Sequence, residues 1–298
     1  MYGGLVAPVA LRLLLCDAAT LAKLRITLLS VATAATGMIL ANSSIAFYQF
    51  MSLLGIALVV AAANVFNMYI EAPFDARMLR TSQRPLPAGR WQPAWVWAWG
   101  CSLLLGSCVL LATCANVLTL CIGLGAFALY LFGYTPLKRK TSFALFVGAV
   151  AGAAPPVMGY TAASGRIDAI ACILFAILFV WQIPHFLAIS ILRQQEYSQA
   201  GFVMFSQVFG HRVCKWTKLV SAAVLCAVSL LLWRTDACGA LYATVAVVVG
   251  LWFAAVCAKG FVCSCHTQWA RQVFYASLIY PLLLFAAVWV DRSVYFAA

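Results

Sequence analysis

The sequence predicts an all-α, polytopic membrane protein with about nine transmembrane helices. Three observations support this fold class. Hydrophobic residues make up 65% of the 298-residue chain and charged residues only 9%, and the mean hydropathy is +1.00, whereas a soluble domain is close to half apolar and a quarter charged. Apolar runs long enough to cross about 30 Å of hydrocarbon recur along the whole chain. Because lipid offers no hydrogen-bond partners to backbone N–H and C=O groups, such runs are expected to form helices.

Nine apolar runs account for most of the chain, and the fourth and seventh are the shortest. We expect all 298 residues to belong to one integral membrane domain, in which residues 1–23 form a short N-terminal segment. The predicted spans, in order, are 24–41, 47–70, 94–113, 117–133, 143–163, 167–189, 219–233, 239–258 and 273–290.

The distribution of lysine and arginine orients these spans. Sixteen of the 19 lie on the side of the N-terminus, and Arg166, Arg234 and Arg292 lie on the other side. Positive residues are retained on the side from which spans insert, so this split supports nine spans. The long loops predicted on this positive face are 71–92, 134–142 and 190–216. Topology thus explains most of the net charge of +12, and nothing beyond charge supports nucleic-acid binding.

Cysteine and most acidic residues carry little functional signal. Twelve cysteines are present, mostly inside the apolar runs, where a free cysteine behaves as a small hydrophobe. The cluster Cys263, Cys265 and His266 could bind a metal, but it lacks a second pair of ligands. The acidic residues that we place at helix ends near solvent are Asp17, Asp168, Asp236 and Asp291.

An acidic stripe follows the second predicted span. Asn64, Asn67, Glu71 and Asp75 recur at helical spacing, so they share one face if the helix continues through them. Pro73 removes a backbone donor and can kink this turn, which leaves the alignment of Asp75 open. Carboxylates at the end of a membrane helix are costly unless they hold a cation or pair with a base. Oxygen ligands at this spacing suit Mg²⁺ shared with a substrate phosphate. A salt-bridge cluster that only closes the helix end is the alternative.

Basic residues in the first two loops suit a diphosphate. The arginines that follow the acidic stripe are Arg77, Arg80, Arg84 and Arg90. Guanidinium groups match phosphate oxygens. The next loop, with the sequence YTPLKRK, places Tyr134 four residues before Lys138 and adds Arg139. This segment is either an ordinary positive loop or a second basic wall around a diphosphate. Such a wall would neutralise charge on the diphosphate and make the diphosphate a better leaving group.

The sixth predicted span ends in WQIPHFLAISILRQQEYSQAG, which supplies a third set of candidates. Trp181, Gln182 and His185 lie on this span, and Glu196 follows it. The histidine is either a hydrogen-bonded structural residue or a residue that ligates haem iron, orients a substrate or acts as a base. Glu196 is a candidate further oxygen ligand for the metal.

These motifs together resemble the protohaem IX farnesyltransferases, a branch of the UbiA-type intramembrane prenyltransferases. The resemblance rests on the pattern NxxxExxxD followed by RTSQRPLPAGR, then YTPLKR, GAVAGAAPPVMGY and WQIPHFLAISILRQQEYSQAG, and it extends from Leu21 to the start of the seventh span. The wording ExPFD and YTPLKR resembles the mitochondrial branch. Two departures are Leu24, where the family usually has proline, and Gln195 with Glu196, which replace a pair of aspartates.

The resemblance implies a UbiA-like bundle around a central cavity, in which Mg²⁺ holds farnesyl diphosphate at the loop face. It assigns Asn67, Glu71, Asp75 and Lys138 to catalysis. The implied metal ligands are Asn67, Glu71, Asp75 and Glu196, and the implied diphosphate-binding residues are Arg77, Arg84, Tyr134, Lys138 and Arg139. The residues implied to bind or orient haem are His185, Trp181 and Gln182.

The implied reaction transfers a farnesyl group to a vinyl group of haem B and makes haem O for haem A biosynthesis. The lipid bilayer and the downstream haem A synthase are implied partners. The implied location is the mitochondrial inner membrane with the catalytic loops facing the matrix. Two alternatives remain at this point. A prenyltransferase acting on a quinone precursor would more typically show two aspartate-rich motifs, and a polytopic transporter would show inverted repeats or charges at mid-span.

Overall fold

The computed structural model describes residues 7–41 and 46–295, and within these ranges the chain forms helices and turns without a β-strand. The elements are α1 (Ala7–Leu21), α2 (Leu24–Ala41), α3 (Phe47–Asp75), α4 (Pro93–Cys114), α5 (Val117–Ala128), η1 (Leu129–Tyr134), α6 (Thr135–Leu137), α7 (Ala144–Gly152), α8 (Ala154–Ser164), α9 (Ala169–Leu192), α10 (Gln194–Gln199), α11 (Phe205–Arg234), α12 (Ala240–Ala258), η2 (Lys259–Phe261) and α13 (His266–Tyr295). The predicted all-α fold class is confirmed.

Nine helical segments of the described chain are long and apolar enough to cross a membrane, as the sequence predicts. The largest difference in bounds concerns the seventh span, predicted at 219–233, because α11 begins much earlier, at Phe205. Gly210, with a φ of +71°, joins two helical pieces there, a backbone conformation that favours glycine. Hydropathy misses this first part of α11 because it is polar. The predicted loop 190–216 is therefore largely helical, with α10 and the start of α11 inside it.

Two acidic residues that we expected near solvent are buried instead. Asp17 lies on α1 and is 7% exposed, because Arg90 donates two hydrogen bonds of 2.8 Å to its carboxylate. Asp291 lies on α13 and is fully buried. It accepts hydrogen bonds from the backbone N–H groups of Gly239 and Tyr242, which have no partner within the helix because they lie at the start of α12. The prediction was wrong because a carboxylate loses water at little cost where such donors replace it.

Small residues allow α2 and α8 to approach closely. A Cβ added at Gly159 would lie 1.8 Å from the carbonyl oxygen of Ala34, and one added at Gly37 would lie 2.0 Å from that of Pro156. Close approach through small residues is a main source of helix association in lipid. The two prolines of this segment, Pro155 and Pro156, stand in the first turn of α8, where the missing N–H groups cost nothing.

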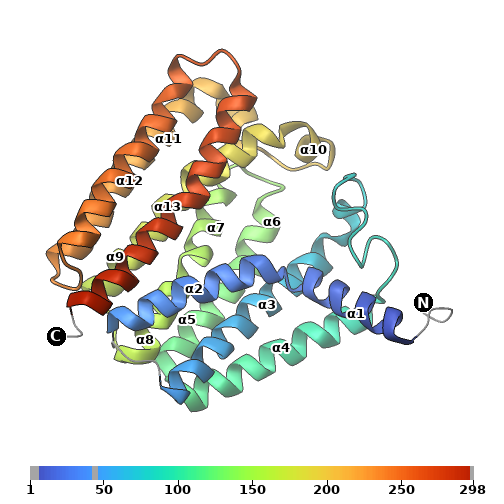
Figure 1. Cartoon of the computed structure of the whole chain (residues 1–298). Helices are drawn as coiled ribbons and strands as arrows, with labels where there is room; N and C mark the ends of the chain where they lie inside the picture. The colour runs from blue at the N-terminus through green and yellow to red at the C-terminus, as the bar shows by residue number, and fades with distance from the viewer. Residues whose placement is uncertain (1–6, 42–45, 296–298) are drawn as a thin grey trace.

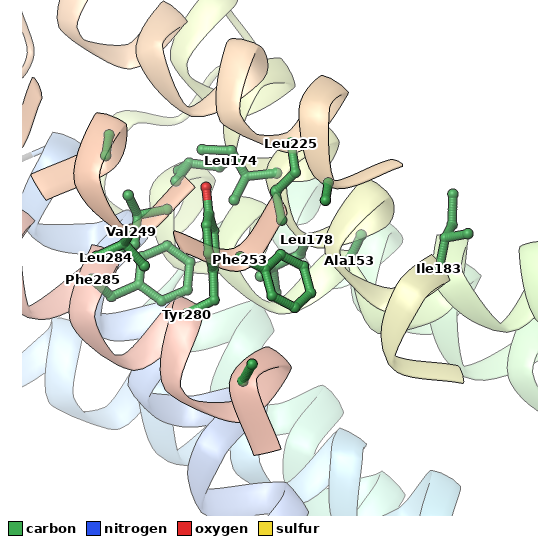
Figure 2. Close-up of a cluster of buried hydrophobic side chains, with 14 of the residues drawn as sticks. Ala153, Leu174, Leu178, Ile183, Leu225, Val249, Phe253, Tyr280, Leu284 and Phe285 are labelled. Atoms are coloured by element: carbon green, nitrogen blue, oxygen red, sulfur yellow. The ribbon is translucent and has the colours of Figure 1, made fainter. Parts of the chain in front are cut away.

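The largest hydrophobic cluster joins α9, α11, α12 and α13, which lie together on one side of the bundle, opposite α3 and α4 (Figure 1). Figure 2 shows side chains of this cluster, with Phe253 and Tyr280 at its centre. Their ring centroids are 5.5 Å apart, and the buried hydroxyl of Tyr280 is 2.9 Å from that of Ser229. On the opposite side, the segment after α3 meets α10 at one end of the bundle (Figure 1).

Candidate active site

A polar cavity of about 120 Å³ lies at the C-terminal end of α3. Its walls come from the junction of α1 and α2, from α3 and the segment after it, from η1 and α6, and from the segment around α10. The charged residues in these walls are Lys23, Glu71, Asp75, Arg80, Arg84 and Lys138. Four bases face two acids, so the described walls carry net positive charge and suit an anionic ligand.

Helix α3 presents the acidic stripe to this cavity. The helix continues through Pro73 and ends at Asp75, so the predicted alignment holds to its last residue. Pro73 is tolerated in the final turn, where Ala76 donates to the carbonyl oxygens of Ala72 and Phe74 and closes the helix. Asn67, Glu71 and Asp75 are 1%, 7% and 2% exposed. Their polar groups therefore depend on the cavity and on its bases instead of bulk water.

Each carboxylate of the stripe has its own base. Lys138 forms an ion pair with Glu71, in which its Nζ contacts Oε1. Arg84 donates a hydrogen bond of 2.6 Å to Oδ2 of Asp75. The predicted alternative of a salt-bridge cluster thus describes part of the geometry. These contacts involve one oxygen of each carboxylate, which leaves Oε2 of Glu71 and Oδ1 of Asp75 as further ligand atoms.

Asn67 connects the stripe to two residues that the sequence analysis did not single out. Its Nδ2 donates to Oε1 of Glu71 at 2.8 Å and to Oγ1 of Thr135 at 3.1 Å. Its Oδ1 accepts a hydrogen bond of 2.9 Å from Nζ of Lys23. Lys23 comes from the junction before α2, 44 residues away, so local spacing gives no signal for the contact. The only sequence signal for Lys23 is its place in the LAKLRIT segment.

Lys23 is electrostatically unusual. It lies just before the membrane span of α2, and burial lowers the pKa of its ammonium from the ordinary 10.5 to about 8. The carboxylate of Glu71 opposes this lowering, the charges of Lys138 and Arg84 add to it, and Asp75 opposes it weakly. The surroundings of Lys23 therefore disfavour its charged form. Strongly shifted pKa values of this kind cluster at functional sites.

A π-helical turn, η1, forms the wall opposite α3. It ends at Tyr134, so this residue is helical and not in the loop 134–142 where the sequence analysis placed it. Tyr134 stacks on Tyr130 with ring centroids 5.3 Å apart. The Lys138 ammonium lies 5.3 Å from the Tyr134 ring and 5.0 Å from the Phe202 ring. Gly148 makes room for the tyrosine, because a Cβ there would come within 2.8 Å of its ring. Such π-turns occur frequently at functional sites.

A second, largely apolar cavity of about 640 Å³ adjoins the polar one, and Tyr130 and Tyr134 line both. Its walls come from α2, α3, α5, η1, α7, α8, α9 and α13. Apolar residues that line it include Val59, Met158, Leu178 and Phe285. The pair of cavities therefore offers a charged chamber for a polar group and an apolar chamber for a hydrophobic one.

The apolar cavity is lined by the predicted residues of α9. Nδ1 of His185 lies 2.8 Å from Oγ of Ser277, and the ring stacks with Trp181 and Phe274 at centroid distances of 5.2 and 5.1 Å. Trp181 donates from its indole nitrogen to the carbonyl oxygen of Ser277. Gln182 donates to carbonyl oxygens of the protein, so its amide nitrogen has a structural contact. With Nδ1 engaged, Nε2 is the nitrogen of His185 that a ligand can use.

Three predicted residues lie outside the walls of the polar cavity. The guanidinium groups of Arg77 and Arg139 lie over the ring of Phe74, 5.7 and 4.6 Å from its centroid. Glu196 accepts a hydrogen bond of 2.8 Å from Arg193 and lies 3.6 Å from Arg80. The structure thus brings Asn67, Glu71, Asp75, Arg84, Tyr134 and Lys138 together, whereas Glu196 links two loops beside them. Its role as a metal ligand stays a prediction.

The CxCH segment shows no metal-binding geometry in the part of the chain that the structure describes, where no three His, Cys, Asp or Glu side chains come together as a metal site. Cys263 Sγ lies 3.4 Å from the carbonyl oxygen of Cys265, and the ring of His266 lies 4.5 Å from that of His211.

Comparison with known proteins shows the family and the fold of the chain. Residues 30–289 match the UbiA prenyltransferase family. The chain belongs to this family. Among solved structures, a UbiA homolog from Aeropyrum pernix K1 matches with a TM-score of 0.70 at 19% identity, over 89% of this chain and 98% of that one. A UbiA homolog from Archaeoglobus fulgidus bound to GPP and Mg²⁺ matches with a TM-score of 0.66 at 13% identity, over 91% and 99%. The UbiA-like bundle is thereby confirmed as the fold.

Curated relatives within the UbiA family are more similar in sequence. Proteins described as protoheme IX farnesyltransferase from Anaeromyxobacter sp. (strain Fw109-5) and from Myxococcus xanthus (strain DK1622) are each 42% identical to this chain. The first match covers 91% of this chain and 92% of the relative, and the second covers 93% and 94%. A relative of the same description from Bacillus subtilis (strain 168) is 37% identical over 82% of this chain and 78% of its own.

Proposed function

We propose that this UbiA-family prenyltransferase transfers a farnesyl group from farnesyl diphosphate to a vinyl group of haem B and so makes haem O. One observation supports this most directly: a charged chamber with acids and bases shares Tyr130 and Tyr134 with a large apolar chamber. A prenyl diphosphate has a charged head and an apolar tail, so it fits the two chambers together. The curated relatives described above support the choice of haem B as acceptor.

The acidic stripe in the wall of the polar cavity fits Mg²⁺. Oδ1 of Asn67 and the carboxylates of Glu71 and Asp75 form an all-oxygen set of ligands, which hard divalent cations prefer. When bound there, Mg²⁺ supplies positive charge that stabilises a departing diphosphate. The Archaeoglobus fulgidus homolog is bound to GPP and Mg²⁺, which supports the same arrangement here.

The bases of the chain perform the electrostatic part of the reaction. Lys138 and Arg84 lie beside the acids and neutralise charge on the diphosphate as the bond to the prenyl carbon breaks. The first carbon of the prenyl chain then lies next to Tyr130 and Tyr134, because these rings line both chambers. The prenyl carbon gains cationic character as the bond to diphosphate breaks, and a haem vinyl group attacks it. Water then adds to the resulting cation and loses a proton to solvent, which leaves a hydroxyethylfarnesyl group.

The haem acceptor is assigned to the apolar chamber. His185, Trp181 and Phe274 form an aromatic stack there, and Nε2 of His185 is available for the haem iron. We propose that this stack orients haem B so that one vinyl group faces the two tyrosines. The half-buried rings of Trp181 and Phe274 also limit the access of water from this side, which protects the reactive prenyl carbon until the vinyl group has attacked.

We propose a mitochondrial inner membrane as the location, with the catalytic loops facing the matrix, supported by the ExPFD and YTPLKR segments and by the charge asymmetry. The relatives named above are bacterial, and in a bacterial plasma membrane the same asymmetry places the loops in the cytoplasm. Haem O is the substrate of haem A synthase, so this enzyme is the proposed downstream partner.

The test is expression in a host that lacks haem O, followed by mass spectrometry of the extracted haem. We expect haem B to gain a farnesyl-sized mass with the added water, and no such species with the empty vector. A prenylated benzoate in place of modified haem would support the quinone-precursor alternative. An unmodified haem pool, with the protein present in the membrane, would contradict the proposed function.

A further inference from the structure

We propose that Lys23 is a resident cation of the metal site: its ammonium holds Oδ1 of Asn67 while no metal is bound, and it moves to the diphosphate oxygens when Mg²⁺ and prenyl diphosphate bind. This inference rests on the metal site of the proposed function. It makes Lys23 a ligand-binding residue, whose ammonium competes with a divalent ion for one oxygen and afterwards contributes to diphosphate binding.

The hydrogen bonds of Asn67 define which of its atoms faces Lys23. Both acceptors that its Nδ2 contacts, Oε1 of Glu71 and Oγ1 of Thr135, lie on one side of the amide. The donor Nζ of Lys23 lies on the other side, 2.9 Å from Oδ1. Because Asn67 is 1% exposed, water does not replace these partners. The only oxygen that Asn67 can offer to a metal is therefore the one that Lys23 occupies.

Among Lys23, Arg84 and Lys138, the bases that contact the acidic stripe, Lys23 is the one whose direct partner is neutral. Lys138 and Arg84 each pair with a carboxylate, Glu71 and Asp75 respectively, so moving either base leaves a buried negative charge without its partner. The hydrogen bond of Lys23 to Asn67 is made to a neutral amide. When Lys23 moves away, Asn67 loses one donor but no charge partner.

The backbone directs Lys23 into the cavity. Its φ of +45° is in the left-handed region, which a residue with a side chain rarely adopts. The backbone N–H of Lys23 donates to Thr20 at 3.1 Å, and its carbonyl oxygen accepts from Ile26 at 2.8 Å and from Thr27 at 3.1 Å. The break between α1 and α2 is thus held by hydrogen bonds on both sides. A strained residue whose side chain lines a charged cavity is a frequent sign of function.

The experiment compares Mn²⁺ and inorganic pyrophosphate binding to the purified full chain in detergent. Free Mn²⁺ is measured by electron paramagnetic resonance without diphosphate, and pyrophosphate binding is measured by calorimetry in the presence of a chelator. For Lys23→Met we expect the Mn²⁺ dissociation constant to fall about tenfold and that of pyrophosphate to rise about tenfold, as the removal of one nearby charge in a partly screened site predicts. Lys140→Met is the matched control, because Lys140 is exposed and its replacement removes the same charge from the same face of the protein.

The two dissociation constants separate the possible outcomes. Opposite shifts in Lys23→Met, with neither shift in Lys140→Met, support the inference. A loss of both affinities shows that Lys23 only maintains the fold, and unchanged affinities show that it does not reach the ligands, so either result overturns the inference. Lys23→Gln, which retains a polar side chain, replaces Lys23→Met if the latter does not fold. A wild type that binds Mn²⁺ no better than Asp75→Asn removes the metal site of the proposed function itself.

Discussion

Replacing Lys138 by methionine is the sharpest test of how the polar cavity acts. The lysine ammonium contacts Glu71 and lies 5.3 and 5.0 Å from the rings of Tyr134 and Phe202, which fix its position beside the acids. Methionine fills a similar unbranched volume between these rings but carries no charge. The loss of one preorganised charge from a site that stabilises a leaving group is expected to lower kcat by about 10²–10³, or about 3–4 kcal/mol.

This change is also expected to affect folding. Glu71 loses its charge partner in Lys138→Met but keeps the hydrogen bond of 2.8 Å from Nδ2 of Asn67. We expect a loss of about 3 kcal/mol in the free energy of unfolding, which is the lower end of the cost of removing one partner from a buried ion pair. Thermal unfolding of the purified protein measures this loss independently of activity.

The assay is the initial rate of farnesyl transfer to haem B in proteoliposomes at saturating Mg²⁺, with kcat and KM determined separately. Lys140→Met is the control, since this lysine lies two residues further on and is exposed. A folded Lys138→Met protein with kcat within about threefold of wild type would refute the assigned role. An equal loss in Lys140→Met would show that the general surface charge, and not a contact in the cavity, determines the rate.

Three further predictions use the same structure. Asp75→Ala is expected to abolish the product, because the proposed metal site loses a buried carboxylate and Arg84 loses its partner, while the protein still inserts into the membrane. Turnover at the wild-type rate would remove Asp75 from the site. His185→Ala is expected to weaken haem B binding, seen as a lost shift of the Soret band. Pyrophosphate binding is expected to stay unchanged, since His185 lines the apolar chamber and not the charged one; an unchanged Soret band would exclude iron ligation. Asp168→Ala is expected to cost about 1 kcal/mol at pH 7, because Asp168 caps α9 at Ile170 and Ala171. Burial raises the pKa of Asp168, but hydrogen bonds from Tyr160, Ala171 and Arg166 lower it below its ordinary value of 3.8. Stability from this carboxylate is therefore present above pH 4 and is lost as the pH falls through the folded pKa, so the difference between wild type and Asp168→Ala in thermal unfolding should shrink in acid; a difference that stays constant down to low pH would contradict it.

The membrane spans and the acidic stripe were predictable from the sequence because both depend on local spacing. Hydropathy locates α2 and α3, and a period of three to four residues places Asn67, Glu71 and Asp75 on one face. Because of Pro73, the sequence alone did not decide whether the last turn of the helix forms. In the structure this turn is helical, because backbone hydrogen bonds after the proline close the helix.

The partners of these residues depend on contacts between distant segments, which spacing cannot reveal. Lys23 and Thr135 reach Asn67 across 44 and 68 residues, and the π-turn η1 has no simple sequence pattern. The surroundings of Glu196 were also not predictable, since Arg80 belongs to another loop. Charge alone suggested a metal ligand there. Tertiary packing adds Arg80 to the local neighbour Arg193, which lies three residues before Glu196.

The two tyrosines shared by both chambers have a consequence for the fate of the products. Under the proposed reaction, the bond to diphosphate breaks beside Tyr130 and Tyr134, and the prenyl group becomes attached to the porphyrin. The site then holds a highly charged diphosphate on one side and an enlarged, apolar porphyrin on the other. The first dissolves in water at the loop face, and the second partitions into the surrounding lipid. Because the two products leave in opposite directions, the departure of one does not depend on a path that the other occupies.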